Sequence, residues 1–208
     1  MKTLFFISSL LINCRPSPVD IAPDGDIEPT IGAEDHTGSH GIAEHPADGV
    51  IGAPDCQQVD IGDKACNFRL LDQNRDVWSL YDHAGDIIVL DFSAVWCPPC
   101  QTAGYYAQSL QDAYADDGVQ IVTILIDGAT TGVEPTAAEV DSWVTGHNVT
   151  TAPVLQGSRD KMFDSAAIEG YALSGFPTYI YIGRDMKFYA GHVGFSEEYI
   201  RQTIEGAL

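Results

Sequence analysis

The fold of this 208-residue chain is decided by the stretch Asp91-Phe92-Ser93-Ala94-Val95-Trp96-Cys97-Pro98-Pro99-Cys100. It joins residues 87–92, an apolar run typical of a buried strand, to a segment from Pro98 onward that is predicted to be helical. The first cysteine is therefore expected at a helix N-terminus, where unpaired N–H groups and the helix dipole favour a thiolate. The second cysteine follows one helical turn later, close enough to form a disulfide.

Strands and helices alternate around this stretch. The predicted strands are residues 68–71, 77–80, 87–92, 119–126, 154–155, 178–182 and 187–193, and the predicted helices are residues 98–114, 135–147, 160–168 and 196–207. The first two strands surround a turn at residues 72–75. Such an order predicts an α/β fold with a central mixed β-sheet, helices on both of its faces and an antiparallel pair at its end.

Two motifs carry a family resemblance. Trp96-Cys97-Pro98-Pro99-Cys100, together with the distant Gly175-Phe176-Pro177-Thr178, resembles the thioredoxin superfamily and, within it, the exported TlpA/ResA-like thiol–disulfide oxidoreductases. The similarity covers residues 60–208 and implies a thioredoxin-like fold with an N-terminal β-hairpin extension and an inserted αβ unit after residue 135. It also implies that the bond before Pro177 is cis and faces the cysteines, so that the backbone of Phe176 can pair with an extended client chain.

The resemblance also assigns catalytic roles. Cys97 is predicted to be the nucleophile and Cys100 the cysteine that resolves the mixed disulfide. Asp91 stands where thioredoxin has a buried acid, so desolvation would raise its pKa and let it take the proton of Cys100. An alternative is that Asp91 only bonds a neighbouring backbone group. Thr123 stands where thioredoxin has the lysine partner of that acid.

A client-binding surface is predicted around the cysteine pair. Trp96, Pro98 and Pro99 flank the sulfurs and Phe176 precedes the proline, although packing alone would also explain Trp96. The chain departs from its relatives at Tyr105, where they often carry a helix-kinking proline.

The first residues predict export. Residues 1–14, MKTLFFISSLLINC, have a positive end at Lys2 and an apolar stretch too short to span a bilayer as a helix. They resemble a bacterial lipoprotein signal in which Cys14 is lipidated, which would attach the protein to the membrane on the periplasmic side of the cell envelope. Asn13 departs from the small residue favoured before the cysteine. Simple secretion, a weak anchor and a mis-assigned start remain alternatives.

Residues 15–58 are predicted to be an acidic disordered tether, followed by the thioredoxin-like domain at residues 59–208. No Lys or Arg occurs between Pro16 and Asp63, and the whole chain has 30 acidic and 10 basic residues, a net charge of −20. This charge repels phosphate backbones and excludes nucleic acid as a partner. Histidines at positions 36, 40 and 45 lack preorganised neighbours, so no metal site is predicted.

The remaining cysteines are even in number once Cys14 is set aside. Cys56 and Cys66 are expected to form a structural disulfide that pins the tether to the domain. A redox relay to the Cys97–Cys100 pair and two unpaired thiols are the alternatives.

The predicted function is thiol–disulfide exchange with disulfide- or dithiol-bearing proteins outside the cytoplasm. The resemblance suggests reduction of clients, with electrons from a membrane thiol reductase and no organic cofactor. A thiol peroxidase is one alternative, although Ala94 stands where peroxiredoxins need threonine. A copper-binding protein is another; it would use His192, although such relatives have three residues between their cysteines.

Overall fold

The computed structural model describes residues 60–162, 170–171 and 173–208. Its strands are β1 (Arg69–Leu71), β2 (Val77–Ser79), β3 (Ile87–Ala94), β4 (Val119–Asp127), β5 (Val154–Gln156), β6 (Thr178–Ile182) and β7 (Phe188–Val193). Its helices are α1 (Pro98–Tyr114), α2 (Ala137–Gly146), α3 (Arg159–Met162) and α4 (Glu197–Glu205), with short 3-10 helices η1 (Leu80–His83) and η2 (Ala115–Asp117). The predicted lipidation of Cys14, the tether at residues 15–58 and Cys56 lie outside the described residues.

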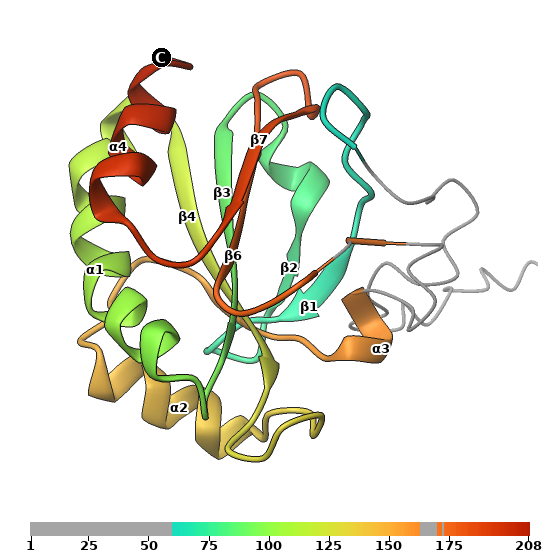
Figure 1. Cartoon of the computed structure of the whole chain (residues 1–208), viewed down its shortest axis with the longest axis vertical. Helices are drawn as coiled ribbons and strands as arrows, with labels where there is room; N and C mark the ends of the chain where they lie inside the picture. The colour runs from blue at the N-terminus through green and yellow to red at the C-terminus, as the bar shows by residue number, and fades with distance from the viewer. Residues whose placement is uncertain (1–59, 163–169, 172) are drawn as a thin grey trace, which may run out of the picture. The chain divides into compact units, whose positions relative to one another are not determined.

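In the described part of the chain, seven strands form one mixed sheet in the order β2-β1-β5-β4-β3-β6-β7 (Figure 1). β3, β4 and β5 are parallel neighbours, whereas β6 and β7 continue the sheet in antiparallel fashion. The hairpin of β1 and β2 joins the other side through β5. The predicted mixed sheet with a closing antiparallel pair is therefore confirmed.

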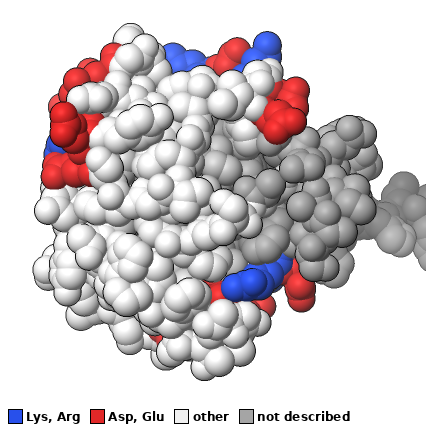
Figure 2. Space-filling model, in the orientation of Figure 1, with Lys and Arg blue, Asp and Glu red and all other residues white. Residues whose placement is uncertain are grey.

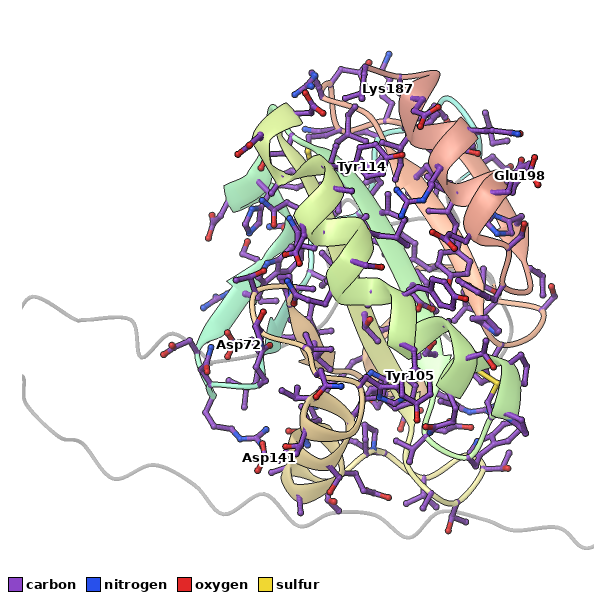
Figure 3. The ribbon with its side chains drawn as sticks, turned by 90° about the vertical axis from the view of Figure 1, so that its left-hand side faces the viewer. Asp72, Tyr105, Tyr114, Asp141, Lys187 and Glu198 are labelled. Carbon is purple, nitrogen blue, oxygen red and sulfur yellow. A yellow bond between two sulfur atoms is a disulfide. The ribbon has the colours of Figure 1, made fainter. Side chains whose placement is uncertain are left out.

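Central strand β3 is buried along its whole length and supplies side chains to both faces of the sheet. Ile88 and Leu90 belong to a core that includes Met162 of α3 and Trp78 of the hairpin. Ile87 and Val89 point the other way, into a core with residues of α1 and α4. Figure 3 shows α1 between α4 and α2 on that second face, so the expected helices on both faces are confirmed.

Local signals set the ends of the helices. α1 stops at Tyr114, and after η2 the chain turns at Gly118, whose φ of 70° suits glycine. α2 begins two residues later than expected because Thr136 is its N-cap: the Thr136 hydroxyl accepts the N–H of Glu139, whose carboxylate accepts the N–H of Thr136. The helix expected at 160–168 is seen as α3, and its remainder lies outside the described residues.

Among the residues that the structure describes, no helix has both the length and the apolar character needed to cross a bilayer.

Candidate active site

The two cysteines lie where β3 ends and α1 begins. Cys97 is the N-cap of α1, and its Sγ accepts the N–H of Cys100 at 3.4 Å. The two sulfurs form a disulfide, with Cα atoms 5.2 Å apart, visible as the yellow bond in Figure 3. Pro98 and Pro99 fill the exposed first positions of the helix, where a missing N–H costs no hydrogen bond. The pair thus sits at the positive end of the helix dipole, as expected from the sequence.

A cis proline faces this disulfide. The Phe176–Pro177 bond is cis and directly precedes β6, which pairs with β3. The carbonyl oxygen of Phe176 lies 3.6 Å from Sγ of Cys97, although the two residues are 79 positions apart. The sheet register therefore brings together the two motifs that carry the family resemblance.

Trp96 and Phe176 form an aromatic border beside the sulfurs. Trp96 is 40% exposed, and its ring meets the Phe176 ring edge-on with centroids 6.3 Å apart. The guanidinium of Arg159 lies 5.8 Å from the centre of the Phe176 ring. Phe176 thus contacts both an indole and a cation, next to the carbonyl that contacts Cys97.

The buried carboxylate of Asp127 binds both Trp96 and Arg159. Asp127 is fully buried; it accepts the Trp96 indole N–H at 3.1 Å and two N–H groups of Arg159 at 2.8 and 2.7 Å. The N–H of Gly132 adds a further bond at 2.9 Å. Burial alone would raise the pKa of Asp127, but these hydrogen bonds outweigh it and lower the pKa below the usual value. Asp127 therefore stays ionised and fixes the border.

Sequence reasoning missed Asp127 and Arg159. A signal for Asp127 exists, because it directly follows the predicted strand at residues 119–126. β4 runs parallel to β3, so its carboxyl end reaches the same edge as Cys97. Arg159 follows a short strand with no local pattern, and only the three-dimensional contact identifies it.

Asp91 lies within β3 and is almost fully buried. Its Oδ1 accepts the Ser93 hydroxyl at 2.7 Å and its Oδ2 accepts the Tyr179 hydroxyl at 3.3 Å. Burial raises the pKa of Asp91 to about 7, against the smaller opposing effects of the two hydrogen bonds. Thr123, its neighbour in the register on β4, has a buried hydroxyl without a hydrogen-bond partner among the described residues. The carboxyl can therefore gain or lose a proton near neutral pH.

The other predicted residues lie apart from this centre. Cys66 is buried in the core on the opposite face of the sheet from the Cys97–Cys100 pair. Its predicted bond to Cys56 lies outside the described residues. His192 lies in β7, where its ring stacks on the ring of Tyr179 in β6. Within the described ranges, no group of three His, Cys, Asp or Glu side chains could hold a metal ion.

A disulfide at the junction of a strand and a helix, next to a cis proline at the start of the neighbouring strand of a mixed sheet, defines a redox protein of the thioredoxin-like fold. The chain belongs to the AhpC/TSA family, whose model matches residues 61–187.

Comparisons with individual proteins agree with this assignment. The chain is 34% identical to the thiol-disulfide oxidoreductase ResA of Oceanobacillus iheyensis over 85 residues, which are 39% of this chain and 44% of that protein. A ResA of Bacillus cereus is 26% identical over 154 residues, which cover 74% of this chain and 80% of the relative. A Chlorobium tepidum structure described as the thiol:disulfide interchange protein DsbE has a TM-score of 0.58 and 29% identity, covering 72% of this chain and 98% of that one.

Proposed function

We propose that this protein reduces disulfides of extracytoplasmic client proteins with electrons carried by the Cys97–Cys100 pair. The chain is a thiol–disulfide oxidoreductase of the thioredoxin fold, like the relatives named above. The observation that carries the proposal is the position of the Cys97 sulfur. It lies at the N-terminus of α1, bonded to Cys100 and 3.6 Å from the carbonyl that precedes the cis proline.

The exchange proceeds in two displacements. In the reduced protein, the Cys97 thiolate attacks one sulfur of the client disulfide; a mixed disulfide forms and the first client thiolate leaves. Cys100 then loses its proton and attacks the Cys97 sulfur, which releases the second client thiolate and closes the Cys97–Cys100 bond. The client gains two electrons, the protein loses two, and the released thiolates take up protons from the site or from solvent.

Asp91 is the proposed acceptor of the Cys100 proton. It occupies the face of β3 that α1 covers, because Ile87, Val89 and Asp91 stand at every second position of the strand and therefore point to the same face. Its pKa of about 7 suits a group that must be a carboxylate when Cys100 attacks and can return the proton afterwards. This geometry supports general-base catalysis by Asp91.

The client is proposed to bind across the aromatic border. Its extended chain would pair with the backbone of Phe176, while Trp96 and the exposed rings of Pro98 and Pro99 contact its side chains. Figure 2 shows that the centre of the visible face, over β6 and the first turns of α1, carries few charged side chains, whereas acidic groups gather near α4. A largely uncharged surface favours recognition of backbone and apolar groups over recognition of charge.

The proposed location rests on the sequence pattern of residues 1–14, and the proposed electron supply rests on the family resemblance. Lipid on Cys14 would tether the protein at the periplasmic side of the membrane, where a membrane thiol reductase could return electrons to Cys97–Cys100. The chemistry needs no organic cofactor, since the disulfide itself stores the electron pair.

A trapping experiment tests the exchange. Cys100→Ser keeps the nucleophile but removes the resolving thiol, so a disulfide-linked complex with an oxidised model client should accumulate; Cys97→Ser is the matched control and should trap none. Equal trapping by both variants, or no reduction of any protein disulfide by the reduced wild type, would refute the proposal. Peroxide consumption by the reduced protein without a client would favour a thiol peroxidase instead.

The direction of the reaction is tested by equilibration with glutathione. A reduction potential of the Cys97–Cys100 pair near that of thioredoxin, about −270 mV, supports the reductant, whereas a value near −120 mV identifies an oxidant and overturns the proposed direction.

A further inference from the structure

Among the residues that the structure describes, hydroxyl groups alone bond the carboxyl of Asp91. Within the described ranges it forms no ion pair with Lys or Arg, and its hydrogen-bond partners are the hydroxyls of Ser93 and Tyr179. Thr123 faces it from β4 but donates no bond to it. A buried carboxylate without a cation depends on such donors to be ionised at all.

Tyr179 is fixed in place from both sides. On β6 it pairs in the register with Asp91 of β3 and with His192 of β7. Its ring stacks on the His192 ring at 4.8 Å and an interplanar angle of 10°, and Tyr199 of α4 meets His192 edge-on at 4.5 Å. Tyr179 is 3% exposed, so its hydroxyl has little freedom to turn away from the carboxyl of Asp91.

We infer that Tyr179 is a positioning residue whose hydroxyl holds Oδ2 of Asp91 and favours its carboxylate form, with His192 holding the tyrosine ring in register. The inference rests on the proposed role of Asp91 in the exchange. Burial, followed by the nearby charge of Asp91, raises the pKa of Tyr179 far above its usual value. The hydroxyl therefore keeps its proton and remains a donor at every pH at which Asp91 titrates.

Other titratable or charged groups belong to the elements that cover this face. They are Cys100, Tyr105, Tyr106, Asp112 and Tyr114 on α1, Tyr181 on β6, Tyr189 and His192 on β7, and Glu197, Glu198, Tyr199, Arg201 and Glu205 on α4. None of them forms a hydrogen bond or ion pair with Asp91 in the described structure; Arg201 pairs with Glu197, and Tyr114 donates to Glu205. Tyr179 is thus the titratable group in direct contact with the Asp91 carboxyl.

The test measures the titration of Asp91 directly, without reference to activity. The infrared band of a protonated carboxyl is followed against pH in the oxidised protein, and subtraction of the Asp91→Asn spectra isolates the Asp91 signal. Tyr179→Phe removes one hydroxyl bond to a charged group, so Asp91 should become about tenfold weaker as an acid and its midpoint should rise by about one pH unit. The matched control is Tyr189→Phe, which removes a tyrosine hydroxyl from the same core; that hydroxyl is buried and has no hydrogen-bond partner among the described residues.

The outcomes separate this inference from the proposed function. A raised midpoint in Tyr179→Phe, with none in Tyr189→Phe, supports it; an unchanged midpoint in Tyr179→Phe, or equal shifts in both variants, overturns it. If Tyr179→Phe does not fold, 3-fluorotyrosine at position 179, a stronger donor, must lower the midpoint, and no change would overturn the inference. Full exchange activity in Asp91→Asn would refute the catalytic role of Asp91 while leaving the measured effect of Tyr179 intact.

Discussion

Replacing Asp91 by asparagine should stabilise the oxidised protein, and the gain should depend on pH. Asp91 is nearly inaccessible to water, and burial is the main cause of its raised pKa. In the unfolded chain the carboxyl ionises in water at its ordinary pKa, so charging it inside the fold costs free energy of folding. Asparagine keeps the shape of the acid without its charge, and a hydroxyl of Ser93 or Tyr179 can rotate to accept from its amide N–H.

The size and the pH range of the effect follow from the two pKa values. The pKa of Asp91 rises from 3.8 to about 7 on folding. Between these values the folded state binds more protons than the unfolded state, so stability falls as pH rises. The cost is absent below pH 4, grows through this interval and is complete above pH 7. About three pH units at about 1.4 kcal/mol each give a cost of about 4 kcal/mol at pH 8.

Urea unfolding of the wild type and of Asp91→Asn, with the disulfide intact, measures this cost at several pH values. At a slope of about 2 to 3 kcal/mol per molar urea, the midpoint of the variant should lie about 1.3 to 2 M higher than that of the wild type at pH 8 and at nearly the same urea concentration at pH 4. Asp116→Asn, at an exposed position, is the matched control and should change little at either pH. A difference between Asp91→Asn and wild type that stays constant from pH 4 to pH 8 would refute the assignment of a raised pKa to Asp91.

Two further predictions concern the surroundings of the disulfide. Asp127→Asn should destabilise the fold by about 2 to 3 kcal/mol at pH 7, because the buried amide cannot accept all the bonds from Trp96 and Arg159; thermal unfolding measures the loss, and Trp96 fluorescence should report a freed indole. Since the pKa of Asp127 is lowered, this loss should shrink as pH falls below about 4, and a loss of equal size at pH 3 would contradict the role of its charge. Gly104→Ala should cost about 1 to 3 kcal/mol despite the better helix propensity of alanine, because the new Cβ would lie 2.7 Å from Cδ2 of the buried His147. The cost should fall in the His147→Ala background, and simple additivity of the two changes would argue against the clash.

Much of the fold was predictable from local patterns. The run at residues 87–92, the Cys-Pro-Pro-Cys turn and the periodic segment that follows indicate a strand, a tight junction and a helix, and β3 and α1 have nearly these bounds. β3 extends to Ala94, beyond the apolar run, because its pairing with β4 continues through Asp127. Short-range patterns identify elements well and their ends less well, since the partner strand decides where pairing stops.

The site was only partly predictable, for a physical reason. The contact of Phe176 with Cys97 was expected from the family resemblance and not from spacing, because the order of strands in the sheet brings the two motifs together. Tyr179 stands next to the Gly175–Thr178 motif, yet its bond to Asp91 depends on the register of β6 against β3. Arg159 could not be found at all, since its bond to Asp127 joins segments with no shared pattern. The predicted roles of Cys14 and Cys56 stay predictions.

Two buried aspartates on neighbouring strands illustrate how the surroundings divide the work of this site. Both lose water on folding, which by itself raises a carboxyl pKa. A guanidinium, an indole and a backbone N–H all donate to Asp127. These hydrogen bonds lower its pKa by more than burial raises it, so Asp127 remains charged. Within the described ranges Asp91 accepts hydrogen bonds from neutral hydroxyls only, and burial raises its pKa to about 7, so its proton is exchangeable near that pH. Separation of two like groups by their partners is a common way to assign one carboxylate to structure and another to proton transfer. The permanent charge here anchors Trp96 and Arg159 at the border where a client would dock, and the titrating one lies on the face of β3 beneath α1, where a resolving thiol must give up its proton.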